Sequence, residues 1–167
     1  MDKIQQMLIK MLKRNKFFEN MSDEHLLKFS NLFKLWTCKE GTAIIIEWHI
    51  PKNIFILKRW VLVAKKANWL NSIVLWEVKE GEVFWEMSFF YKKPAMASVI
   101  CNSSTADYWE ISRENFELFL KENPEVKTQI IDVLSSREKH NKDVLWWSFK
   151  PIVADTKDDL WDIEINL

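Results

Sequence analysis

The stretch VFWEMSFFYKKPAMASV, at residues 83–99, decides how the rest of the sequence is interpreted. A strand-like run, LWEV at 75–78, and the turn-forming KEGE lead into it, and β-branched residues follow it. A loop of this kind between two strands is typical of a backbone cradle for a phosphate group. Two residues depart from that pattern. Trp85 stands where the backbone should approach the anion, and Ala95 stands where a cation should lie.

Short strand-like runs surround this stretch. They are rich in β-branched residues, and turn-like pieces such as KEG, HIPKN and CNSS separate them. Six or more short strands at this spacing predict an antiparallel sandwich or roll. The runs are TAIIIE (42–47), NIFILK (53–58), VLVAKK (61–66), SIVLWEV (72–78), MASVI (96–100) and DYWEIS (107–112).

Helical patterns lie on both sides of the strands. Apolar residues recur at helical spacing over 3–13, and Ser22 before two acids predicts an N-cap for a second helix that ends near Leu35. After the strands, Ser112 or Asn115 caps a short helix, and Pro124 begins a longer one that runs toward His140. We therefore expect N-terminal helices (1–35), a β-roll (36–112) containing the loop at 83–99, C-terminal helices (113–143) and an acidic tail (144–167) without a DNA-binding domain.

Composition narrows the class of protein. Lys+Arg and Asp+Glu number 24 each, so no overall charge favours nucleic acid or an anionic membrane. Two cysteines do not form a disulfide framework, and with neither a signal peptide nor an apolar run of bilayer length we expect a cytoplasmic protein. The three histidines are scattered, which disfavours a metal site, and no nucleophile motif indicates an enzyme.

The order of the segments and the motif at 83–99 resemble the cyclic nucleotide-binding domain family. That family includes the sensor half of catabolite activator proteins and the regulatory domains of gated channels and kinases. Its phosphate-binding cassette runs phenylalanine, glycine, glutamate, an aliphatic residue, and serine or alanine. After a spacer come arginine, serine or threonine, alanine and a β-branched strand. The residues that match are Phe84, Glu86, Met87, Ser88, Ala97, Ser98 and Val99.

The resemblance covers roughly residues 15–143 and implies a fold and a ligand. It implies an antiparallel β-roll, a double-stranded β-helix or jelly roll, with flanking helices. It also implies a non-enzymatic regulatory or sensor module for a cyclic nucleotide, cAMP or cGMP. In the cassette the glutamate accepts a hydrogen bond from the ribose, and the arginine neutralises the phosphate. The candidate ligand-binding residues are Phe84, Trp85, Glu86, Met87, Ser88, Ala95, Met96, Ala97 and Ser98.

Two departures from the cassette predict that cyclic nucleotide binding is weakened or lost. Ala95 occupies the position of the arginine and Met96 that of the serine or threonine, and neither side chain can bond a phosphate. Leaving a bound phosphate without its cation costs roughly 2–5 kcal/mol. Two hypotheses follow: a sensor for a small ligand, or an interaction or scaffold protein with a vestigial pocket.

The long C-terminal helix is a second candidate for function. It places an apolar stripe on one side, which fits a homodimer, a protein partner or a cover for the chain's own roll. Too few residues follow His140 for a helix-turn-helix domain, so we do not expect direct DNA binding. The stripe consists of Val126, Ile130, Val133 and Leu134.

Tryptophans occupy positions where the family has glycine. The chain has ten tryptophans and two glycines, and a tryptophan at a tight turn is unfavourable because a positive φ is costly for a bulky residue. One hypothesis is a genuinely tryptophan-rich protein. The other is that UGA codons, which some bacterial lineages read as glycine, stand behind these residues. The five positions are Trp48, Trp60, Trp69, Trp76 and Trp85.

Overall fold

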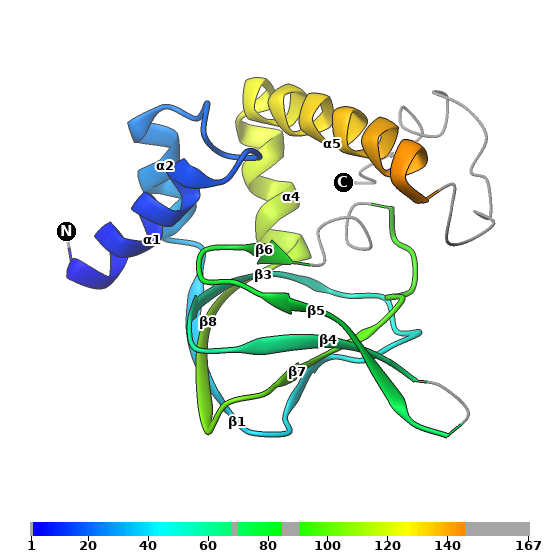
Figure 1. Ribbon diagram of the computed structural model, residues 1–167. Helices are drawn as coiled ribbons and strands as arrows, with labels where there is room; N and C mark the ends of the chain where they lie inside the picture. The colour runs from blue at the N-terminus through cyan, green and yellow to red at the C-terminus, as the bar shows by residue number, and fades with distance from the viewer. Residues whose placement is uncertain (1, 68–69, 85–90, 146–167) are drawn as a thin grey trace.

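Four helices and eight strands make up the described part of the chain, which is residues 2–67, 70–84 and 91–145 of a computed structural model (Figure 1). The side chains of residues 134 and 136–145 are not described. In chain order the elements are α1 (Lys3–Arg14), α2 (Asp23–Ser30), β1 (Lys34–Lys39), β2 (Ala43–Ile45), β3 (Asn53–Arg59), β4 (Leu62–Ala67), β5 (Ser72–Val78), β6 (Val83–Phe84), β7 (Ser98–Cys101), β8 (Thr105–Ser112), α4 (Arg113–Glu122) and α5 (Pro124–Leu145).

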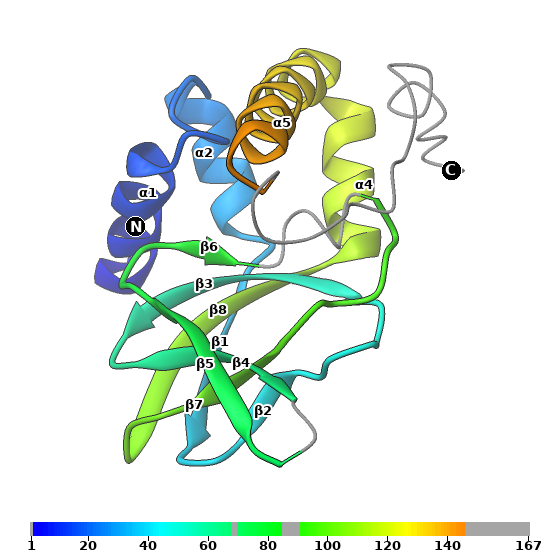
Figure 2. The ribbon, with the colours of Figure 1, turned by 45° about the vertical axis from the view of Figure 1, so that its right-hand side comes forward.

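Two four-stranded antiparallel sheets form the roll. The strand orders are β1-β8-β3-β6 and β2-β7-β4-β5, and each pairing is antiparallel. The helices gather on one side of the roll, as both views show (Figures 1 and 2). The predicted antiparallel β-roll with flanking helices is therefore confirmed. Within the described ranges, no helix is long and apolar enough to cross a membrane.

Apolar residues collect in two clusters, one on each face of the β1-β8-β3-β6 sheet. The first, the roll-interior cluster, fills the space between the sheets and comprises Cys38, Ile45, Phe55, Leu57, Leu62, Ala64, Val78, Phe84, Ala95, Ala97, Val99, Cys101 and Ala106. The second, the helical cluster, joins the opposite face of this sheet to the helices and comprises Leu8, Met11, Leu12, Phe17, Phe18, Met21, Leu26, Phe29, Ile54, Ile56, Trp109, Ile111, Phe116, Phe119, Leu120, Val126 and Ile130.

Local signals in the sequence explain where the helices begin. Ser22 accepts a hydrogen bond from the His25 N–H, and Ser112 accepts one from the Asn115 N–H, so both serines are N-caps. The prediction that the second helix reaches Leu35 is wrong, because α2 ends at Ser30. The residues from Lys34 onward instead pair with β8, and this tertiary pairing overrides the local helical pattern.

The stripe of α5 is covered by the chain itself. Val126 and Ile130 are buried in the helical cluster, and Val133 packs against it. At the start of α5, His25 Nε2 of α2 lies 3.1 Å from the Glu125 carboxylate. The Leu134 side chain lies outside the described residues. Of the three uses expected for this helix, the described part of the stripe serves as intramolecular cover.

Two tryptophans occupy backbone conformations that favour glycine. Trp48 has φ 69° and Trp60 has φ 74°, beside Gly41 at 78° and Gly81 at 81°. Their side chains are 70% and 56% exposed, so little packing offsets the strain. Trp76, in contrast, lies within β5, and residues 69 and 85 lie outside the described ranges. The glycine hypothesis thus gains a conformational argument at positions 48 and 60.

Replacing both tryptophans with glycine tests that argument. We expect Trp48→Gly/Trp60→Gly to raise the free energy of unfolding by roughly 1 kcal/mol in total, because relief of the left-handed strain exceeds the entropy cost of glycine. Urea denaturation measures it. Trp36→Gly is the matched control, since Trp36 is also exposed but lies within strand β1 and should lose roughly 0.5–1 kcal/mol. A double variant less stable than the parent chain contradicts the argument, as do UGG codons at both positions.

Candidate functional site

A backbone clamp holds the second half of the 83–99 stretch against the loop that follows β2. The Trp48 N–H donates to the Ala95 carbonyl at 2.8 Å, and the Ala95 N–H donates to the His49 carbonyl at 2.9 Å. One step further, the Glu47 N–H donates to the Ser98 hydroxyl at 2.9 Å. Residue 95 is therefore held by main-chain bonds that do not depend on its side chain.

Burial alternates along residues 95–97. Ala95 and Ala97 are fully buried in the roll-interior cluster, whereas Met96 between them is 61% exposed. This is the period of an extended chain with one face on a core. The β-carbon of residue 95 therefore lies inside the roll. Burying a charge there is costly in free energy unless the charge is paired.

Aromatic rings extend the buried wall from the start of the cassette. Phe84 stacks on Phe55 with centroids 5.3 Å apart, and Phe55 meets Tyr108 edge-on at 5.9 Å. Burial, followed by the nearby charges of Glu110 and Cys38, raises the pKa of Tyr108 to about 12, so this phenol stays neutral at ordinary pH. The wall formed by these three rings is apolar except for the neutral hydroxyl of Tyr108.

The predicted site residues separate into three groups. Phe84, Ala95 and Ala97 come together in the roll-interior cluster. Met96 points to solvent, and the Ser98 hydroxyl is engaged by the Glu47 backbone, which gives that serine a structural contact. The remaining candidates, Trp85, Glu86, Met87 and Ser88, lie outside the described residues.

Glu47 belongs to this region and was not predicted from the sequence. Glu47 is buried, and its carboxylate accepts a hydrogen bond of 2.9 Å from the Ala67 N–H at the end of β4. It thus ties the loop after β2 to β4 and places an acid near residue 95. The only sequence signal was a charged residue that ends the apolar run TAIIIE.

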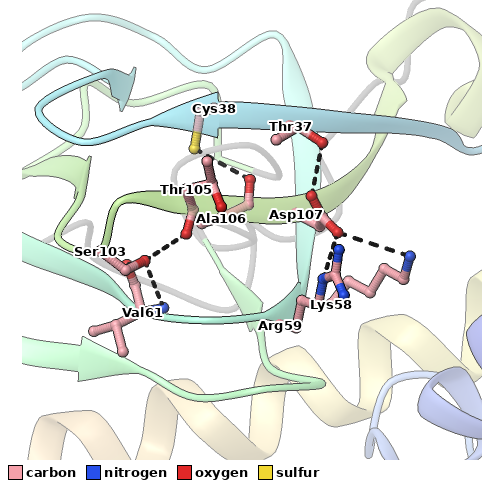
Figure 3. Close-up of polar contacts among 9 residues, drawn as sticks. All are labelled: Thr37, Cys38, Lys58, Arg59, Val61, Ser103, Thr105, Ala106 and Asp107. Carbon is pink, nitrogen blue, oxygen red and sulfur yellow. Dashed lines mark hydrogen bonds and ion pairs between the residues drawn. The ribbon is translucent and has the colours of Figure 1, made fainter.

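A second polar network lies on β8 and its neighbouring strands (Figure 3). The Asp107 carboxylate accepts hydrogen bonds of 2.6 Å from the Thr37 hydroxyl and from Arg59 Nε, and Lys58 Nζ lies 3.9 Å away. Burial alone raises the pKa of Asp107, but the bonds from Thr37 and Arg59 and the two positive charges outweigh it and lower the pKa below 3.8. The arginine is thus already paired with an acid and supports the sheet.

We expect Asp107→Asn to lower the free energy of unfolding by about 1.5–3 kcal/mol at neutral pH, because a hydrogen-bonded buried charge is lost. The folded-state pKa lies below the unfolded value, so the contribution is full above pH 4 and is lost as pH falls through the folded pKa. Denaturation of both chains between pH 7 and pH 3 measures it. Asp23→Asn is the matched control, since exposed Asp23 pairs with Lys13 on the surface and should change stability by less than about 1 kcal/mol. A difference that does not shrink at low pH contradicts the assignment.

The cysteines and the metal-binding side chains of the described ranges were also compared with known site chemistry. Cys38 and Cys101 are free and buried, and burial together with Cys101 raises the pKa of Cys38 to about 12. A thiol with such a pKa is a poor nucleophile. Among the described residues no cluster of three or more histidines, cysteines or acids could hold a metal ion.

Solved structures of cyclic nucleotide-binding domains share this fold. A cyclic nucleotide-binding domain from Methylobacillus flagellatus aligns with a TM-score of 0.70 at 15% identity, over 90% of this chain and 88% of that one. The regulatory subunit of a cAMP-independent protein kinase A from Trypanosoma cruzi, bound to guanosine, aligns with a TM-score of 0.63 at 15% identity, over 70% and 40% of the two chains.

A third structure is a mutant of the corresponding subunit from Trypanosoma brucei, bound to cAMP in its A site. It aligns with a TM-score of 0.65 at 17% identity, over 84% of this chain and 51% of that one. One of its three substitutions replaces a threonine with arginine. The chain spans about half the length of the kinase subunits that it matches. Neither a protein-family model nor a curated protein matches the sequence.

These similarities define the class of the fold. The chain has the β-roll of the cyclic nucleotide-binding domains, with helices before and after it, and the resemblance first found at residues 83–99 is borne out at this level.

Proposed function

We propose that the chain is a non-enzymatic regulatory or sensor module, located in the cytoplasm, whose binding of cyclic nucleotides is weakened or lost. The observation that carries the proposal is Ala95. The resemblance to the cassette puts Ala95 at the position of the phosphate-binding arginine. Its methyl group is buried in the roll-interior cluster, and its own N–H and carbonyl are both bonded to the loop at 48–49.

Electrostatics supports the loss of phosphate binding. A cyclic phosphate keeps one negative charge at neutral pH, and a pocket that removes its water must supply a countercharge. The side chain at position 95 supplies none, and the buried carboxylate of Glu47 lies on the adjoining loop. Without the arginine, the free energy of binding a cyclic nucleotide becomes roughly 2–5 kcal/mol less favourable.

An uncharged ligand does not meet this penalty, so we propose a nucleoside as the ligand class. The Trypanosoma cruzi subunit, from a cAMP-independent protein kinase A, is bound to guanosine, and the Trypanosoma brucei mutant that gains an arginine is bound to cAMP. Glu86, at the position of the ribose-binding glutamate, would accept from a ribose hydroxyl of either ligand. The apolar wall ending at Tyr108 suits a neutral group.

A scaffold protein with a vestigial pocket is the second candidate function. The observation in its favour is the exposure of three apolar residues near position 95 in the chain or on the loop bonded to it: Ile46, Ile50 and Met96 are each about half or more exposed. Apolar side chains gathered on a surface are typical of protein–protein contacts. A homodimer through α5 has less support, because Val126 and Ile130 are already buried within the chain.

Restoring the cation tests the role of position 95. We expect Ala95→Arg/Met96→Thr to bind cAMP one to three orders of magnitude more tightly than the unaltered chain, as the roughly 2–5 kcal/mol of the missing pair requires. Isothermal titration calorimetry measures the affinity. Ala95→Met/Met96→Thr is the matched control, because methionine adds length without charge and should not improve binding. Circular dichroism confirms that each variant stays folded.

Ligand binding by the unaltered chain, measured in the same calorimeter, decides between the two functions. Guanosine or adenosine should bind more tightly than cAMP if the module senses a neutral ligand. Micromolar binding of cAMP by the unaltered chain would contradict the argument from Ala95. If no nucleoside binds and the arginine variant gains nothing, the scaffold function is favoured instead.

A further inference from the structure

The two cysteines of the chain meet inside the roll, although they belong to different sheets. Cys38 lies on β1 and Cys101 on β7, and both are members of the roll-interior cluster. The two thiols are within hydrogen-bonding reach of each other, and Cys101 Sγ lies 4.0 Å from the Cys38 carbonyl oxygen. Because the sequence contains two cysteines in all, these thiols form the one possible pair.

Main-chain hydrogen bonds hold both cysteines in place. The turn after β1 brings the Gly41 N–H to the Cys101 carbonyl at 2.9 Å, and the Cys101 N–H donates to the Thr42 carbonyl at 3.0 Å. Cys38 is paired with Ala106 in the ladder between β1 and β8, and its thiol donates to the Ala106 carbonyl at 3.5 Å (Figure 3). The contact between the thiols therefore follows from the backbone, and the S–H groups themselves are weak donors that the fold does not depend on.

A route to the buried thiols runs through β1. Cys38 is 6% and Cys101 1% exposed, so a reagent reaches them when the roll opens locally. Strand β1 lies at the end of the order β1-β8-β3-β6, and among the described strands it pairs with β8 alone. Residues 34–37 are all exposed. A strand at a sheet edge opens at a lower free-energy cost than the whole domain.

We propose that Cys38 and Cys101 form an oxidative modification site, at which a disulfide joins the two sheets of the roll. The oxidant is a low-molecular-weight disulfide such as oxidised glutathione. One cysteine thiolate attacks it, which forms a mixed disulfide and releases one glutathione thiolate. The second cysteine thiolate then attacks the protein sulfur of the mixed disulfide, so the bond between the cysteines forms and the second glutathione leaves. The protein loses two protons and two electrons, and the two molecules of reduced glutathione carry them away.

The fold and the disulfide should stabilise each other. The bond would close a loop that contains residues 39–100, and closing so long a loop restricts the unfolded chain. By linkage, folding favours the disulfide by the same factor by which the disulfide favours folding. The equilibrium constant for disulfide formation should therefore be roughly 30-fold to 1,000-fold larger in the folded chain than in the unfolded chain.

Redox equilibration of the full-length chain with mixtures of oxidised and reduced glutathione tests the proposal. It is carried out with and without concentrated urea, and intact mass spectrometry after acid quenching resolves the disulfide form, which is about 2 Da lighter than the dithiol form. Burial and the neighbouring Cys101 thiol raise the pKa of Cys38 and slow the exchange, so the equilibrium and not the rate is measured. We expect the ratio of folded to unfolded equilibrium constants given above, and a higher melting temperature for the oxidised chain.

Cys38→Ala/Ala97→Cys is the matched control. Its cysteines, at positions 97 and 101, also lie in the roll-interior cluster. Four residues of extended chain keep their α-carbons about 13 Å apart, which is too far for a disulfide in the folded state. Its ratio should fall below one. In Cys101→Ala the loss of about 2 Da should disappear, and oxidised glutathione should leave the melting temperature unchanged.

Three results would overturn the proposal. The first is a ratio in the unaltered chain that is no larger than one. The second is an end product that retains one glutathione, because the second thiol then fails to reach the first. The third is a disulfide-linked dimer on a non-reducing gel, because the cysteines then pair between two copies of the chain.

Discussion

The structure depends on two adjacent strands, β3 and β8, which bury residues on both faces of the sheet β1-β8-β3-β6. In β3 four consecutive residues, Ile54 to Leu57, are buried, with Phe55 and Leu57 in the roll-interior cluster and Ile54 and Ile56 in the helical cluster. Trp109 of β8 joins the helical side. A slip of one residue between β3 and β8 would exchange the two faces and spoil both clusters together. The roll and its helices therefore rely on a single register.

Much of the fold could be predicted because its signals are local. Alternating β-branched runs identified six of the eight described strands, all but β1 and β6, and Ser22 and Ser112 identified two helix starts. The end of α2 was missed because β1 is specified by pairing with β8, from residues about 70 positions away. The same limit applies to the site. The sequence pointed to Ala95 and Ser98, but Glu47 contacts Ser98 across 51 positions, and no local pattern encodes that contact.

The clamp at residue 95 makes the backbone there independent of the side chain at that position. The two hydrogen bonds of Ala95 use main-chain atoms, and Ala97 and Val99 anchor the following residues in the interior. The roll therefore requires only that the β-carbon of residue 95 can be buried. Alanine meets that requirement without any ligand. Solved structures at 15–17% identity share the fold, and two of them hold different ligands, guanosine in one and cAMP in the other.

The left-handed turns at Trp48 and Trp60 have a stereochemical consequence. A φ near +70° is unfavourable for an L-residue and lies in the ordinary helical region of its mirror image. In a chain assembled by chemical ligation, D-alanine would therefore suit both turns better than any L-amino acid with a side chain. Ribosomal synthesis has one achiral residue to offer such positions, which is glycine. The handedness of two surface turns thus restricts the residue at each of them more narrowly than either buried cluster restricts its members.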